Sequence, residues 1–149
     1  MRMAQEGDGM GAMSQAAIER FLAAARIAHL VTLRPDGSPH VAPVWYEYVD
    51  GVFLVWTSRQ FRKVKNIETD ARAVVSIASE DQPYRYVVAE CDVTVSGDDV
   101  WDIGMSISTR YEGEEGGSAF MEAYYDEGNS VVLRLTPRRT MTWSGEDEA

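Results

Sequence analysis

The sequence is poor in the residues that most often carry metal and thiol chemistry. Its 149 residues include one cysteine, Cys91, and two histidines, His29 and His40. A single cysteine excludes an intrachain disulfide, and these three residues lack the spacing of a metal site. We therefore expect no metal centre. Cys91 lies in an apolar segment, where it is expected to act as a small buried hydrophobic residue.

Long apolar runs and targeting signals are also missing. No stretch approaches the roughly 18 apolar residues of a membrane span. The N-terminal residues do not form a basic region followed by an apolar one, as a signal peptide would. These absences predict a cytoplasmic protein that does not enter a membrane.

Basic residues are scarce, because the sequence has 14 Lys and Arg but 24 Asp and Glu, which gives a formal net charge of −10. Such a charge disfavours nucleic acids and anionic membranes as partners. Four of the cations nevertheless occur together, at Arg59, Arg62, Lys63 and Lys65. This grouping indicates a local anion site, and the alternative is an ordinary solvated surface.

The familiar catalytic motifs are absent as well. The sequence has no Gly-x-Ser-x-Gly elbow, no Walker loop and no Gly-x-Gly-x-x-Gly between a strand and a helix. An enzyme built on this chain would therefore depend on a bound cofactor for its reactive centre.

The hydrophobic periodicity predicts one mainly β domain at 14–145, between a disordered tail at 1–13 and an acidic tail at 146–149. Ser14 is a candidate cap for the first helix. We expect strands at 27–33, 41–48, 52–57, 71–78, 84–95, 131–136 and 139–143, helices at 17–25, 58–69, 98–111 and 119–125, and a Gly/Glu loop at 112–118. Pro43 implies an edge, a bulge or a break in its strand. The whole pattern indicates a β-barrel with peripheral helices.

The strongest candidate site follows the third predicted strand. Thr57 and Ser58 end that strand, and Arg62 and Lys63 begin the next helix. Hydroxyl groups, free N–H groups at a helix start and a lysine charge together can hold a phosphate. The alternative is a capped amphipathic helix whose inward face is Phe61, Val64 and Ile67.

A second candidate site is aromatic. It combines Pro43-Val44-Trp45 with Trp56 and with Tyr84-Arg85-Tyr86. A proline that interrupts a strand can leave backbone groups free to bind a flat heterocycle, although aromatic residues on barrel strands are more often core.

These pieces resemble a known family when they are taken in order. The segments are Leu33-Arg34-Pro35-Asp36-Gly37-Ser38-Pro39-His40-Val41-Ala42-Pro43-Val44-Trp45, Asp50-Gly51, Arg62-Lys63-Val64-Lys65-Asn66-Ile67, Asp70-Ala71-Arg72 and Pro83-Tyr84-Arg85-Tyr86-Val87. Over about residues 21–143 the chain is similar to the flavin/deazaflavin oxidoreductases, and most similar to their B branch, the pyridoxamine 5'-phosphate oxidase-like proteins.

The resemblance implies a split β-barrel of the FMN-binding type that forms a homodimer, with FMN or the deazaflavin coenzyme F420 at the subunit interface. Lys63, Arg62, Thr57 and Ser58 would hold the cofactor phosphate, and Asn66 would support the phosphate loop. The remaining implied cofactor residues are Val41, Ala42, Pro43, Val44 and Trp45 along the ring, with Tyr84, Tyr86 and Trp143 from the second subunit.

The implied reaction is hydride transfer to a small conjugated substrate, and no side chain is singled out as catalytic. Tyr46, Tyr86 and Tyr111 are candidate proton donors. The C-terminal segment 137–145 lacks the Arg and His substrate motif of genuine pyridoxamine phosphate oxidases, which argues against vitamin B6 oxidation. The alternative function is a non-catalytic carrier of flavin, haem or another tetrapyrrole.

Overall fold

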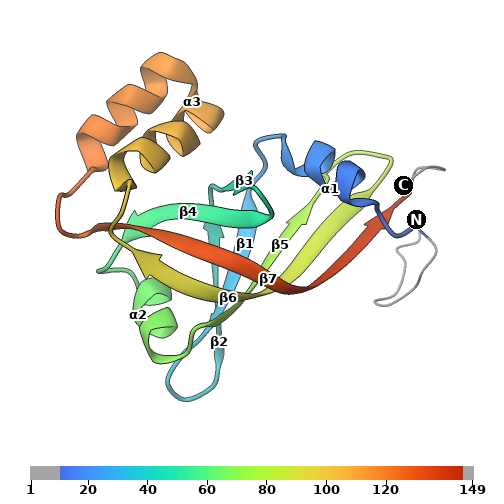
Figure 1. Cartoon of the computed structure of the whole chain (residues 1–149), viewed down its shortest axis with the longest axis horizontal. Helices are drawn as coiled ribbons and strands as arrows, with labels where there is room; N and C mark the ends of the chain where they lie inside the picture. The colour runs from blue at the N-terminus through green and yellow to red at the C-terminus, as the bar shows by residue number, and fades with distance from the viewer. Residues whose placement is uncertain (1–10, 146–149) are drawn as a thin grey trace.

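The computed structural model describes residues 11–145 (Figure 1). Within this range the chain forms one curled antiparallel sheet of seven strands and three helices. The elements are α1 (Gln15–Leu22), β1 (Ala28–Leu33), β2 (Pro39–Val44), β3 (Glu47–Val49), β4 (Val52–Ser58), α2 (Arg62–Thr69), β5 (Arg72–Ala78), β6 (Arg85–Ser96), α3 (Val100–Tyr124) and β7 (Ser130–Ser144). The predicted mainly β, barrel-type fold is confirmed.

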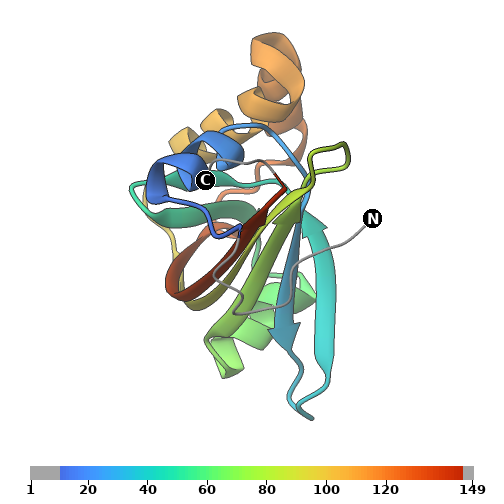
Figure 2. The same cartoon turned by 90° about the vertical axis from the view of Figure 1, so that its right-hand side faces the viewer.

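The sheet is curled but its edges are not paired with each other. The strand order is β2-β1-β5-β6-β7-β4-β3, which places β2 and β3 at opposite edges. Only Trp45 and Tyr46 separate these two strands in the sequence, so the chain itself connects the edges at one point. Figure 2 shows the resulting curvature from the side. The sheet therefore forms a split barrel.

The predicted continuous strand at 41–48 is wrong, because the chain leaves the sheet at Trp45 and Tyr46. The Tyr46 N–H donates to the Tyr111 hydroxyl at 3.1 Å, and the Tyr46 carbonyl accepts from Arg110 Nε at 3.1 Å. These side chains of α3 satisfy backbone groups that a strand neighbour would otherwise bind. Pro43, which has no N–H to donate, lies on the edge strand β2 as its chemistry suggests.

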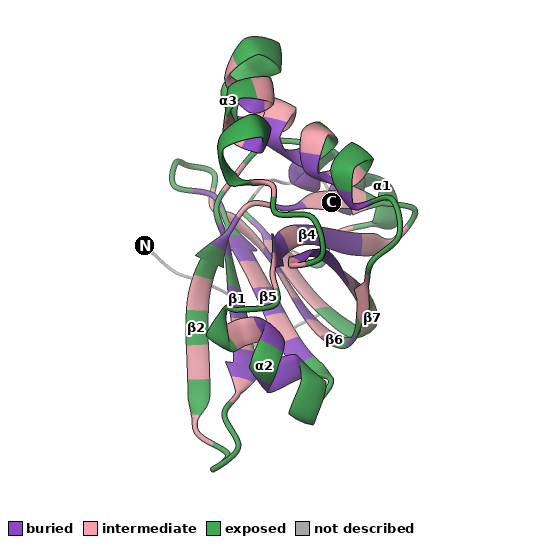
Figure 3. Cartoon of the chain, turned by 90° about the vertical axis from the view of Figure 1, so that its left-hand side faces the viewer, coloured by how far each residue is buried: buried purple, intermediate pink, exposed green. Residues whose placement is uncertain are grey.

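Alternate side chains of the strands fill the inside of the sheet. In β1, for example, Ala28 and Leu30 are fully buried whereas His29 between them is exposed. Cys91 is also fully buried, as expected, and burial raises the pKa of its thiol to about 12. Figure 3 shows the contrast with the edge strand β2, where Val44 is the buried residue.

α1 covers one end of this core. Its N-terminus is fixed as predicted, since the Ser14 side chain accepts a hydrogen bond from the Ala17 N–H at 3.1 Å. Phe21 and Leu22 are then buried against the strands. Burying a side chain of this size stabilises the fold by about 1.5–3 kcal/mol.

The Gly/Glu segment at 112–118 is helical, so the predicted loop is wrong. Gly113 alone leaves the helical conformation, with φ 80° and ψ 173°, and it divides α3 into two halves. A Cβ on Gly117 would lie 2.8 Å from the Thr109 N, so the glycine permits the two halves to pack closely. The glycines therefore build a helical hairpin (Figure 1). No helix within residues 11–145 has the length and apolar character to span a bilayer.

Two other boundaries differ from the prediction. α2 begins at Arg62 and not at Ser58, because Ser58 still belongs to β4 and pairs with Ser130. The two strands expected around Pro137 are the single strand β7. There Pro137 pairs with Cys91 and Arg139 with Glu90, so Arg138 is an extra residue that accommodates the proline in a bulge.

The packed region begins earlier than expected. The Gly11 carbonyl accepts from the Ser144 N–H at 2.7 Å, and the Met13 N–H donates to the Thr142 hydroxyl at 2.8 Å. Residues 11–13 are thus attached to the end of β7. The rest of the predicted N-terminal tail, 1–10, and the predicted acidic tail, 146–149, lie outside the described residues.

Candidate functional site

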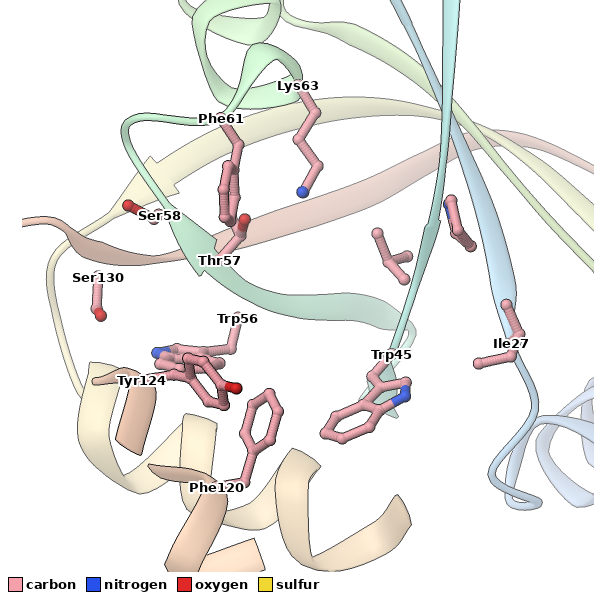
Figure 4. A pocket seen from close by; sticks show the side chains of 12 residues that line it. Ile27, Trp45, Trp56, Thr57, Ser58, Phe61, Lys63, Phe120, Tyr124 and Ser130 are labelled. Carbon is pink, nitrogen blue, oxygen red and sulfur yellow. The ribbon is translucent and has the colours of Figure 1, made fainter. Parts of the chain in front are cut away.

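A cavity of about 500 Å³ lies between α2, α3 and the strands β2 and β4 (Figure 4). Its lining residues are Ile27, Pro43, Val44, Trp45, Trp56, Thr57, Ser58, Phe61, Lys63, Phe120, Tyr124 and Ser130. Both candidate sites identified in the sequence contribute to it. The end of β4 and the start of α2 form one wall, and the end of β2 forms another.

One end of the cavity is polar. Thr57 is 6% exposed, and its hydroxyl has no hydrogen-bond partner among the described residues. Lys63 extends from α2 toward the same space (Figure 4) and has no acidic partner among the described residues. Burial lowers the pKa of Lys63, because the ammonium is partly removed from water. A buried hydroxyl without a partner beside a desolvated cation favours an anionic ligand.

The start of α2 adds to this polarity. Its N-cap residue is Phe61, and no side chain caps the first turn. The Ser58 hydroxyl, the predicted cap, instead accepts from the Gln60 N–H at 3.4 Å. The N–H groups of Arg62 and Lys63 have no acceptor within the helix, and they lie at the positive end of its dipole. The polar end can therefore hold a phosphate group.

The opposite wall is the end of β2. Pro43, Val44 and Trp45 line the cavity there. Because β2 is an edge strand paired only with β1, part of its backbone faces away from the ladder. A flat ring with hydrogen-bonding groups can lie along such a backbone.

Several predicted site residues do not line the cavity. Val41 is 56% exposed on the outer side of β2, while Ala42 packs against the core. Arg62 is exposed. Asn66 is fully buried on the inner face of α2, and its side-chain amide donates to the Thr32 hydroxyl of β1 at 3.0 Å. This hydrogen bond anchors α2, the helix that carries Lys63, on the sheet.

The residues expected from a second subunit lie elsewhere in this chain. Tyr86 and Trp143 pair across β6 and β7, and Tyr84 immediately precedes β6. The cavity is lined by Ser130, at the beginning of β7, whereas Trp143 lies near the end of that strand.

Sequence reasoning missed much of the aromatic lining. Phe120 and Tyr124 come from the second half of α3, a segment far from both candidate motifs. Phe61 was expected on the inward face of a helix, but it is 54% exposed and lines the cavity. Its ring lies 4.6 Å from Lys63 Nζ. The helical spacing of Phe120 and Tyr124 gave no indication of a cavity, and neither did the positions of Ile27 and Ser130.

Two of the candidate proton donors already donate their hydroxyl hydrogens to backbone carbonyls. The Tyr111 hydroxyl donates to the Arg26 carbonyl at 2.6 Å, and the Tyr46 hydroxyl donates to the Leu22 carbonyl at 3.1 Å. Burial raises the pKa of both, to about 12 for Tyr46. Neither lines the cavity, and Tyr86 does not line it either. Among the tyrosines of residues 11–145, Tyr124 is the one that does.

Known structures share the fold over nearly the whole chain. A conserved hypothetical protein from Mycobacterium tuberculosis is 26% identical, with a TM-score of 0.81 over 93% of this chain and 89% of that one. An F420 reductase is 24% identical, with a TM-score of 0.71 over 89% and 96%. The haem storage protein HutZ from Vibrio cholerae is 14% identical, with a TM-score of 0.69 over 87% and 94%. The last two similarities concern the fold alone.

The sequence of the chain also matches a known family. No curated protein sequence matches the chain. Residues 14–144, however, match the family profile described as pyridoxamine 5'-phosphate oxidase. This match covers the sheet, all three described helices and every residue that lines the cavity. The chain therefore belongs to the pyridoxamine 5'-phosphate oxidase family.

Proposed function

We propose that this chain is an oxidoreductase that binds coenzyme F420 or FMN in the cavity and transfers a hydride to a small conjugated substrate. The observation that carries the proposal is the polar end of the cavity. There a buried Thr57 hydroxyl without a partner among the described residues and the partly desolvated Lys63 ammonium face the same space. A phosphate group would give both of them a partner.

The residues present fit a phosphate-bearing ring compound. Thr57, Ser58 and Lys63 would bind its phosphate, and the β2 backbone at Pro43 and Val44 would lie along its ring. The bound deazaflavin or flavin would supply the hydride chemistry. The protein would hold the reactants in contact and exclude water from between them.

A homodimer is part of the proposal, and the outer side of the sheet supports it. Partly exposed apolar side chains lie on this side of the strands from β2 to β7, at Val41, Val31, Leu33, Val74, Val88 and Met141. Val41, Val31 and Val74 pair in register, and so do Val88 and Met141, while the partner of Val74 on β6 is Glu90. Tyr86 and Trp143 lie on the same side, since each is two residues along its strand from Val88 or Met141. A second copy docked here would bury this surface and present its own Tyr86 and Trp143.

The carrier function is the second candidate, because HutZ, a haem storage protein, has this fold. Haem iron commonly takes a histidine ligand. Neither His29 nor His40 lines the cavity, so haem bound there would lack an imidazole from the described residues of this chain. This observation favours a nucleotide cofactor over haem.

Binding experiments test the proposal directly. The freshly purified protein is denatured, and the released small molecules are identified by absorbance and mass spectra. FMN and coenzyme F420 are then titrated into the cofactor-free protein, with inorganic phosphate as a competitor. We expect at least one of them to bind at micromolar concentration and phosphate to weaken it. Affinities no better than about millimolar for both would refute the proposal.

A further inference from the structure

The end of the cavity away from Lys63 is lined with aromatic rings. Trp45 and Phe120 lie 4.9 Å apart between ring centroids at 43°, and Phe120 and Tyr124 lie 4.8 Å apart at 46°. These rings face the same open space (Figure 4). Of the residues that line the cavity, Lys63 alone carries a full charge, and it belongs to the polar end. The aromatic end is therefore suited to a flat, neutral compound.

The fold places these rings by means of the helical hairpin. Gly113 reverses the chain with a positive φ, and Gly117 lets the second half of α3 pack against the first. Phe120 consequently meets Trp56 of β4, with centroids 6.0 Å apart at 72°. Substitution in the second half of α3 would change the aromatic end without touching the polar end.

Trp45 is held in a fixed orientation. Its ring stacks on Tyr111 with centroids 4.9 Å apart and planes 6° apart. The Tyr111 hydroxyl in turn accepts from the Tyr46 N–H and donates to the Arg26 carbonyl. The stacking surface of Trp45 is thus formed before any ligand arrives, which reduces the entropic cost of binding.

Tyr124 supplies the polar group of this end. Its side chain is 66% exposed, and its hydroxyl has no hydrogen-bond partner among the described residues. A phenol can donate one hydrogen bond to a carbonyl oxygen. Aromatic faces with one hydroxyl donor at their margin are complementary to a flat ring that carries an oxygen.

We infer that the aromatic end is the substrate subsite and that it binds a neutral conjugated carbonyl compound of the quinone class. The ring would stack against Phe120 and Trp45, and one oxygen would accept a hydrogen bond from Tyr124. This inference rests on the proposed function for its reaction. In that reaction the reduced cofactor would supply a hydride and solvent a proton, and the quinone would become the hydroquinone.

The test measures quinone binding apart from turnover. The probe is 2-methyl-1,4-naphthoquinone, titrated into cofactor-loaded protein while tryptophan fluorescence is recorded. We expect Phe120→Leu and Tyr124→Phe each to weaken binding about 3- to 10-fold, the range for an aromatic contact or one hydrogen bond. The control is Tyr125→Phe, because the Tyr125 ring packs on Trp101 outside the cavity. Cyclohexane-1,4-dione, which has two carbonyls but no conjugated ring, should bind far more weakly than the naphthoquinone.

Turnover and cofactor affinity separate the possible results. We expect Phe120→Leu and Tyr124→Phe to raise the quinone KM and to leave the cofactor Kd unchanged. If cofactor binding depends on Lys63 but neither variant changes quinone binding, the subsite is wrong and the proposed function stands. If the variants weaken the cofactor and not the quinone, the aromatic end belongs to the cofactor and the inference is overturned.

Two further results are covered by the same experiment. If no cofactor binds at all, the proposed function fails, and quinone titration of the cofactor-free protein still tests the subsite. If Phe120→Leu does not fold, as judged by near-ultraviolet circular dichroism, the result for Tyr124→Phe alone tests the subsite. Tyr124 is exposed, so removing its hydroxyl should not disturb folding.

Discussion

The side-chain amide of Asn66 donates a hydrogen bond of 3.0 Å to the hydroxyl of Thr32, and both residues are at most 1% exposed. This bond connects α2 to β1. Asn66 lies three residues after Lys63, on the next turn of the same short helix. The contact therefore helps to fix the position of the cation at the cavity.

Removing that bond should loosen α2. We expect Asn66→Ala to lower the free energy of unfolding by about 1–3 kcal/mol, because the buried Thr32 hydroxyl loses its partner. Urea denaturation measures the change. Thr32→Val and the double variant complete a thermodynamic cycle, in which additive effects would show that the two side chains are not coupled.

The helical hairpin of α3 depends on a glycine at its contact. In Gly117→Ala the new Cβ would lie 2.8–2.9 Å from backbone atoms of Ser108 and Thr109, so the two halves must separate. We expect a loss of about 1–3 kcal/mol in stability, as for overpacked cores. Gly97→Ala is the matched control, because a Cβ there meets nothing within 4 Å. Equal melting temperatures for the two variants would contradict this explanation of the hairpin.

Ligand binding at the polar end should depend on pH through Lys63. Burial lowers the pKa of its ammonium below the ordinary 10.5, and the charged form is the one that attracts phosphate. Above about pH 7 a phosphate monoester is already mostly dianionic. Affinity should therefore fall as the pH rises toward the pKa of Lys63, and binding should be accompanied by proton uptake in that range.

The control for this titration is Lys63→Arg, whose guanidinium stays charged throughout. Its affinity for FMN or coenzyme F420 should remain level over the same pH range, as measured by fluorescence titration. A decline in the arginine variant equal to that in the wild-type protein would assign the pH dependence to another group.

The outer side of the sheet should carry the dimer contact. Val74→Lys places a charge in its centre, and Glu90 directly opposite on β6 offers the new side chain a partner in the monomer. We expect the dimer Kd to rise at least tenfold, because a charge buried at an interface is costly. Sedimentation velocity measures the change. Val49→Lys on β3, already 40% exposed, serves as the control and should leave the mass unchanged.

The strands and the polar end of the site could be predicted from local sequence. Apolar alternation identifies β1 and β4, and the run of hydroxyl and basic residues from Thr57 to Lys63 is contiguous, so its members must lie together. The break at Tyr46 could not be predicted in the same way. It arises because Tyr111 and Arg110, more than sixty residues later, bind the Tyr46 backbone.

The aromatic end escaped prediction for a related reason. Phe120 and Tyr124 reach the cavity because α3 folds back on itself, and its glycines, interpreted as a loop, are the residues that permit the close packing. The glycine-rich composition of residues 112–118 suggested a flexible loop, but glycine is present there because the two halves of α3 pack too closely for a larger side chain. The likeness to a family could not supply these residues, since none of its motif segments includes them.

If Lys63 binds the phosphate of a ring cofactor, removing its ammonium must weaken the affinity for that cofactor. FMN and coenzyme F420 are titrated into Lys63→Ala and into Lys65→Ala, an exposed lysine on the same helix that does not line the cavity. Loss of a charge-assisted contact of about 1.5–3 kcal/mol predicts at least a tenfold weaker affinity in Lys63→Ala. Lys65→Ala should bind as the wild-type protein does. Equal affinities in both variants would contradict the assignment of this cavity as the cofactor site.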